Sequence, residues 1–171
     1  MKRRDFLLAG CVLAAGAARA HHGWSAFDTG RPLWLHGRVE AVRWVNPHAE
    51  FDLQPEPKLA LPADLGAREV PPQLAPVDAR AILDRAQLPR SLDRSWRIEL
   101  APLSRMQAWG IERLREGETV EVVGYAFADE QPAVLRAEFL WRGGRAYGLR
   151  SAPARAPAGS ADGEPGRRPP T

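Results

Sequence analysis

The residues best suited to chemistry lie at the predicted start of the mature chain. Cleavage of an export signal after Ala20 would leave His21 as the first residue, with His22 beside it. A free N-terminal amine and the imidazole of the same residue can chelate one metal ion through two nitrogens. Such a nitrogen-rich pair favours Cu²⁺ among the divalent first-row ions. The sequence therefore favours a metal site at His21, with copper as the expected ion.

A third nitrogen could come from His22 or from His48, which closes an Asn-Pro-His turn pattern at 46–48. His36 is less suited, because its neighbours on the same strand face are charged. The alternative for His48 is a turn residue whose ring binds a backbone carbonyl. The alternative for the N-terminal pair is an unstructured start that holds no metal.

Six tryptophans are the other candidates for ligand binding. Exposed indole rings on a barrel can stack on bases or sugars. Strand alternation predicts that Trp96 and Trp141 point inward and that Trp34 points outward. We therefore expect Trp34 to face a ligand, with Trp24 and Asn46 as further ligand-facing candidates.

Cysteine chemistry is excluded from the predicted mature chain. The single cysteine, Cys11, lies inside the predicted leader, which rules out thiol catalysis, iron–sulfur clusters and cysteine-bound zinc. The chain also has no phosphate-binding glycine loop, no nucleophile elbow and no two-histidine zinc helix. These patterns favour a non-catalytic binding protein over an enzyme. A copper oxygenase built on His21 is the less favoured catalytic alternative.

Residues 1–20 have the pattern of an export signal. Basic residues at 2–4 precede an apolar stretch at 6–17, and small residues occupy positions 18 and 20. Paired arginines ahead of a Phe-Leu step resemble the twin-arginine form. A periplasmic or secreted protein is expected, without a transmembrane segment in the mature chain. The alternative is a lipid anchor on Cys11 within a lipobox-like sequence.

The net charge of the chain indicates which class of partner it can bind. The chain has a formal net charge of +3, but residues 1–20 hold four basic groups and one acidic group. The predicted mature chain is therefore neutral, with 20 basic and 20 acidic groups. Nucleic acid is an unexpected partner, because phosphate neutralisation dominates such binding. A small ligand or an exported protein is the expected partner.

Period-two alternation predicts a mainly β protein. Strands are expected over 33–44, 49–53, 96–100, 120–127 and 133–141, with a bulge after Ala41 eased by Gly37. A short helix capped by Ser104 should follow the third strand, and Gly143-Gly144 should close one further hairpin into 146–149. This order is that of a small five-stranded OB-like barrel.

Composition divides the chain into three parts. The barrel domain is expected at 21–150, with a Pro-rich insertion at 55–93 whose helical pattern at 78–87 should cap the core. The Ala/Pro/Gly-rich segment 151–171 is expected to be a disordered tail. The expected core contains Val39, Phe51, Leu53, Trp96, Ile98, Val122, Leu135 and Phe139.

Two blocks of the sequence carry a family resemblance. The string His-His-Gly-Trp-Ser at 21–25, with Phe27-Asp28, and the string Trp-Val-Asn-Pro-His at 44–48 resemble an exported bacterial family known only as a domain of unknown function, DUF6152. Gly-Arg-Val at 37–39 fits the same pattern. The resemblance implies an exported, small, barrel-like protein and supplies no activity.

Two functions are therefore open. The leading one is an exported, non-catalytic barrel that binds a divalent metal through His21. The alternative is an OB-like interaction module that recognises a protein, a saccharide or an oligonucleotide through its barrel face. Histidines that lie close together would favour the metal-binding function. An exposed groove at Trp34 would favour the interaction module.

Overall fold

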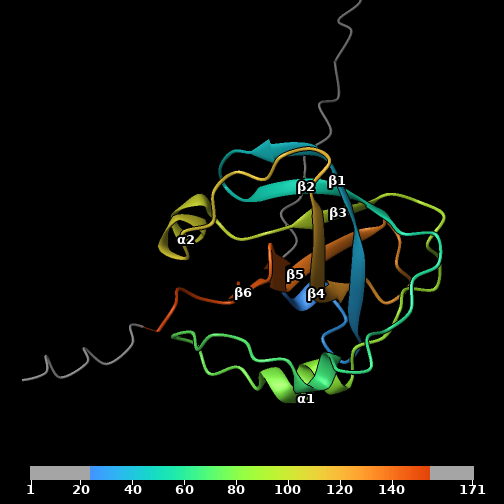
Figure 1. Cartoon of the computed structure of the whole chain (residues 1–171), viewed down its shortest axis with the longest axis horizontal. Helices are drawn as coiled ribbons and strands as arrows, with labels where there is room; N and C mark the ends of the chain where they lie inside the picture. Colours follow the sequence, from blue (N-terminus) through green and yellow to red (C-terminus); the bar gives the residue numbers. More distant parts are fainter. Residues whose placement is uncertain (1–23, 155–171) are drawn as a thin grey trace, which may run out of the picture.

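The strands of the described region close into a barrel. The computed structural model describes residues 24–154, and Figure 1 shows their arrangement. The strands are β1 (Pro32–Trp44), β2 (Ala49–Pro55), β3 (Trp96–Glu99), β4 (Thr119–Ala126), β5 (Val134–Arg142) and β6 (Arg145–Gly148). They pair in the order β3-β2-β1-β4-β5-β6, and a parallel pairing of β3 with β5 closes the first five into a ring. The predicted five-stranded OB-like barrel is confirmed, and β6 lies outside the ring.

The barrel interior is filled by large apolar side chains from every strand of the ring. Seven of the eight predicted core residues lie in this interior cluster, each no more than 1% exposed. They are Val39, Phe51, Leu53, Trp96, Ile98, Val122 and Leu135. The eighth, Phe139, is also fully buried, but it belongs to a second cluster on the outside of the barrel.

A bulge in β5 explains the placement of Phe139. The register between β4 and β5 runs Val123↔Phe139 and then Gly124↔Ala137, which leaves Glu138 as the extra residue. One extra residue sends every following side chain to the opposite face. The prediction that Trp141 points inward is therefore wrong: its side chain faces outward and is partly exposed.

The bulge predicted in β1 is confirmed. The register between β1 and β2 shifts between Glu40 and Arg43, and Ala41 lies at a φ of 28°. A positive φ is uncommon for a residue that carries a Cβ atom. The bulge bends β1 so that its second half leads into the turn at residues 45–48.

The insertion between β2 and β3 packs against the outside of the barrel. It holds the short 3₁₀ helix η2 (Leu65–Ala67) and the helix α1 (Ala79–Asp84), whose first turn is capped by the Asp78 side chain. Buried apolar residues of the insertion form the second cluster with Trp34, Val123 and Phe139. Trp34 points outward as predicted but is only 3% exposed, so the expectation that its ring faces a ligand is wrong.

The helix α2 (Leu103–Ala108) follows β3, as predicted, and lies on a different side of the barrel from α1 (Figure 1). Its N-cap is Pro102 and no side-chain hydrogen bond caps it, so the predicted capping by Ser104 is wrong. Met106 anchors α2 in the barrel interior, where it is 1% exposed.

Both ends of the described region pack onto the barrel. Trp24 opens the 3₁₀ helix η1 (Trp24–Ala26), and Phe27 packs with Tyr125 and Val134 in a third apolar cluster. At the other end, the amide of Ala154 donates to the carbonyl of Pro72 in the insertion over 3.0 Å. No helix within residues 24–154 is long and apolar enough to cross a membrane.

Candidate functional site

The turn that joins β1 to β2 presents His48 to a guanidinium group on β5. Nη2 of Arg136 lies 3.1 Å from Nε2 of His48. A guanidinium can only donate, so this hydrogen bond requires a lone pair on Nε2 and leaves the ring proton on Nδ1. His48 is thereby held as a neutral imidazole with its Nε2 lone pair directed at Arg136.

Arg136 is enclosed by aromatic rings and a carboxylate. Its Cζ lies 5.0 Å from the ring centre of Trp24 and 5.9 Å from that of Phe27. Nη1 lies 3.9 Å from Oε2 of Glu99, and the Arg136 side chain is only 12% exposed. Burial lowers the pKa of Arg136, opposed by the charge of Glu99, and the nearby cations Arg105 and Arg150 lower it further.

Two cations lie over the ring of Trp24. Arg150 lies over the same indole ring, with its Cζ 3.9 Å from the ring centre, and the Tyr125 ring meets Trp24 edge-on at 6.1 Å. Each cation–π contact contributes about 0.5–2 kcal/mol, more where the pair is shielded from water. These contacts fix the position of Trp24 on the outer face of β4 and β5. We call Trp24, His48, Glu99, Arg136 and Arg150 the Arg136 cluster.

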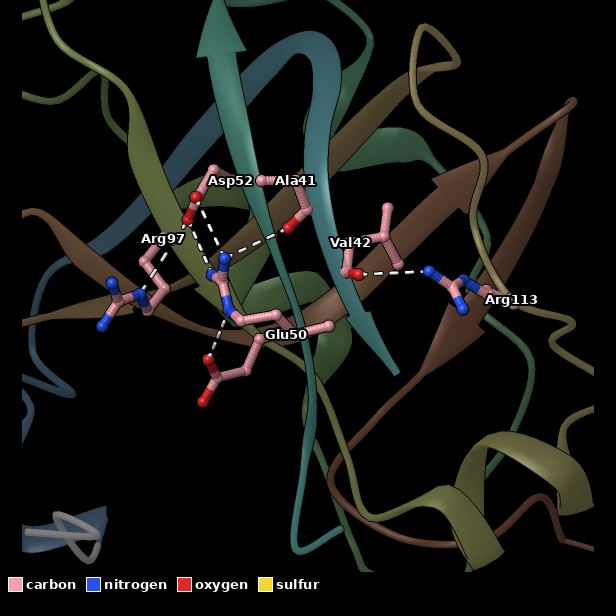
Figure 2. A network of polar contacts seen from close by, with 7 residues as sticks. Ala41, Val42, Glu50, Asp52, Arg97 and Arg113 are labelled. Carbon is pink, nitrogen blue, oxygen red and sulfur yellow. Dashed lines mark hydrogen bonds and ion pairs between the residues drawn. The ribbon is translucent and has the colours of Figure 1, made fainter. Parts of the chain in front are cut away.

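A neighbouring polar network braces the strand that leads to His48. Arg43 donates to Asp52 over 2.7 Å, to Glu50 over 3.2 Å and to the carbonyl of Ala41 over 3.1 Å (Figure 2). The hydrogen bond with Asp52 raises the pKa of Arg43. The network therefore ties the β1 bulge to β2 close to the turn at residues 45–48.

Glu138, the bulged residue of β5, is a buried carboxylate beside this cluster. Its Oε2 accepts from Nε and Nη2 of Arg150 over 2.9 and 2.5 Å, whereas Oε1 has no hydrogen-bond partner in the described region. The side chain is fully buried. Burial raises the pKa of Glu138 against the opposing effect of Arg150.

This raised pKa predicts a pH dependence of stability. A carboxyl whose pKa is higher in the folded state binds its proton more tightly there, so ionisation favours unfolding. The unfolding free energy should therefore decline as pH rises above the ordinary carboxyl pKa of about 4.3, and Glu138→Gln should remove that decline. Urea denaturation between about pH 4 and about pH 7 measures this decline in the unfolding free energy.

Glu40→Gln, on an exposed site, is the matched control. A constant difference between wild type and Glu138→Gln at every pH would contradict the prediction.

The structure separates the sequence-predicted site residues into groups. Trp24 and His48 meet at Arg136, whereas Asn46 is exposed in the turn. His36 lies on the outer face of β1, where Nδ1 is 3.3 Å from Oε1 of Glu56. His21 and His22 lie outside the described residues. Within residues 24–154, no three metal-binding side chains form a group that could hold an ion.

Sequence reasoning missed Glu99, Arg136 and Arg150 as site residues. A usable signal was present, because Glu99 and Arg136 fall on the polar side of the alternation in their strands. In a barrel of this order the third and fifth strands are neighbours, and the register pairs Glu99 with Arg136. Arg136, an outward residue of the fifth strand, contacts His48, and Glu99 of the third strand lies beside Arg136.

Comparison with known proteins gives a family match over part of the chain and no activity. The model of a family of unknown function, DUF6152, matches residues 10–60, which include both the 21–25 and the 44–48 blocks. The resemblance to this family is thereby confirmed for that part of the chain. No curated protein matches the chain. No solved structure matches it.

Proposed function

We propose that the protein is an exported, non-catalytic barrel that binds a divalent transition metal ion, Cu²⁺ above all, at the Arg136 cluster. His48 would supply one nitrogen, and the amine and ring of His21 would supply two more. One observation carries the proposal: the ring of Trp24 lies on Arg136, whose guanidinium donates to the imidazole of His48. The blocks at 21–25 and 44–48, which both lie in the family match, thus each place one residue against the guanidinium of Arg136.

The reach of the chain supports this ligand set. Only three residue steps separate His21 from Trp24, and three extended residues span at most about 11 Å. A mature N-terminus at His21 would start within that distance of Trp24. The amine at this position depends on cleavage after Ala20, which is part of the proposal. His22 remains the alternative source of the third nitrogen.

The protonation of His48 supports it as well. A metal ion needs a neutral imidazole with a free electron pair, and the contact with Arg136 selects that form at Nε2. An arriving ion would replace the guanidinium at this lone pair. Glu99, which lies 3.9 Å from Nη1 of Arg136, supplies a carboxylate that can receive the displaced guanidinium.

The test compares two forms of the mature chain by calorimetric titration with Cu²⁺. One form begins at His21 with a free amine, and the other begins at His21 with that amine acetylated. Acetylation should weaken Cu²⁺ binding at least tenfold, because the acetylated nitrogen can no longer donate a lone pair to the ion. Far-UV circular dichroism should be the same for both forms, since no described residue changes.

Two histidine variants locate the remaining ligand. His48→Ala should also weaken Cu²⁺ binding at least tenfold. His36→Ala is the matched control and should bind as the wild type does, because His36 lies on another face of the barrel and contacts Glu56. Equal affinity of the two N-terminal forms, or no binding by either, would refute the metal function.

A further inference from the structure

A second candidate site lies on the outer surface of the barrel, further along β4 and β5 from the Arg136 cluster. A cavity of about 730 Å³ opens between the insertion and the strands β1, β4 and β5. Its walls include residues 68–72 of the insertion, Thr119 and Glu121 of β4, and Trp141 of β5. The volume falls within the range of about 300–1,000 Å³ that small-molecule sites occupy.

Glu121 is a fixed acceptor in this cavity. Its Oε2 accepts from Nε1 of Trp34 over 3.0 Å and from Nη1 of Arg68 over 2.6 Å. Both bonds use one oxygen, so Oε1 has no hydrogen bond within residues 24–154, and the side chain is 25% exposed. The hydrogen bond from the buried indole of Trp34 holds this carboxylate in place. The same bond satisfies the indole N–H, which allows the ring to stay buried beneath the insertion.

Trp141 and Arg68 form the wall beside this acceptor. The Cζ atom of Arg68 lies 5.9 Å from the ring centre of Trp141, and the Phe139 ring supports the same indole edge-on at 6.0 Å. Arg68 is itself held by Asp64 through Nε over 3.2 Å. The partly exposed indole and the fixed polar groups are thus prearranged, which lowers the entropic cost of binding a ligand.

The charges in the cavity select the class of ligand. Arg68 is the one arginine or lysine among the described residues that line the cavity, and it is already paired with Glu121 and Asp64. Glu69 adds a further negative charge to the wall. A phosphate-bearing ligand would therefore meet a net negative surface, which disfavours an oligonucleotide. A metal cation is disfavoured because Arg68 neutralises Glu121.

A neutral ligand with hydroxyl groups and an apolar face satisfies these walls. Hydroxyls can donate to Oε1 of Glu121 and accept from the guanidinium of Arg68. The C–H face of a sugar ring can lie against the indole of Trp141. We propose that this cavity binds a neutral saccharide, with Trp141 as its stacking surface, Glu121 as hydrogen-bond acceptor and Arg68 as donor. The proposal is independent of the metal function.

The probes are four neutral or anionic oligomers of similar length: cellotetraose, maltotetraose, the tetramer of N-acetylglucosamine, and a short oligothymidylate. Saturation-transfer difference NMR on the whole mature chain should detect at least one of the three saccharides. Calorimetry then gives its affinity. Preferential binding of the oligothymidylate, or binding of none of the saccharides, would overturn the proposal.

Substitutions in the cavity complete the test. Trp141→Ala and Glu121→Gln should each weaken saccharide binding at least tenfold. Trp44→Ala and Glu40→Gln make the same chemical changes at residues that do not line this cavity, and both should bind within twofold of wild type. Trp141→Phe keeps an aromatic surface and should retain more binding than Trp141→Ala. Unchanged affinity in both cavity variants, with folding verified by circular dichroism, would also overturn the proposal.

Discussion

Replacing Trp96 with alanine should lower the unfolding free energy by about 3–5 kcal/mol, because it removes a large ring and leaves a cavity. Trp96 is fully buried in the barrel interior, where it pairs with Leu53 of β2. Its strand β3 also pairs with β5 and so closes the ring. Urea denaturation should show a lower midpoint with an unchanged slope.

Two further variants separate the contribution of the ring from that of its N–H group. Nε1 of Trp96 has no hydrogen-bond partner in the described region, and an unsatisfied buried donor costs about 1–3 kcal/mol. Trp96→Phe removes that donor and keeps most of the ring, so it should destabilise far less than Trp96→Ala. Trp44→Ala, at the partly exposed end of β1, is the matched control. A midpoint for Trp96→Ala no lower than for Trp44→Ala would contradict the buried position of Trp96.

The barrel could be predicted from the sequence because its strands carry one dominant period. Alternation predicted every strand of the ring, and a capping pattern at Ser104 predicted the helix between the third and fourth strands, although its N-cap is Pro102. Closure followed from their order, since the pairing of β3 with β5 is the one that leaves no open edge in the five-stranded ring. Local propensity and burial favour the same arrangement here, as is typical of well-specified folds.

The side-chain directions at the end of β5 could not be predicted in the same way. Alternation from Ala133 to Trp141 looks continuous in the sequence, and the bulge at Glu138 is visible only in the pairing with β4. Bulges of one residue leave no compositional mark when the flanking residues on both faces are apolar. Phe139 and Trp141 therefore lie on the outer face and not on the expected inner face, and Trp141 forms part of the cavity wall.

The site residues were harder to predict than the fold. The outward direction of Trp34 was correct, but the insertion that covers it packs through contacts distant in sequence. Likewise, nothing near His48 in the sequence indicates Arg136, which lies 88 positions further on. Such contacts depend on strand register, which a single sequence fixes only when its bulges are known.

The second large effect is expected at Gly37, where β1 passes close to β2. A Cβ atom there would lie 2.2 Å from the carbonyl oxygen of Gln54 and 2.9 Å from Cα of Pro55, both backbone atoms. β1 is paired with β2 on one side and with β4 on the other at this residue, so it has no free side toward which to move. Gly37→Ala should therefore destabilise by the upper end of about 1–3 kcal/mol, as overpacking does.

Gly66→Ala is the matched control, because it adds the same methyl group against a movable neighbour. The new Cβ would meet Oδ1 of Asp84, the end of a side chain that is 48% exposed and can turn away. A surface change of this kind should alter the unfolding free energy by no more than about 0.5 kcal/mol. Denaturation midpoints of the two variants measure the difference. If Gly37→Ala proved as mild as Gly66→Ala, β1 and β2 would have to separate readily at this point. The bend of β1 would then depend on the bulge at Ala41, and the close approach at Gly37 would not be required.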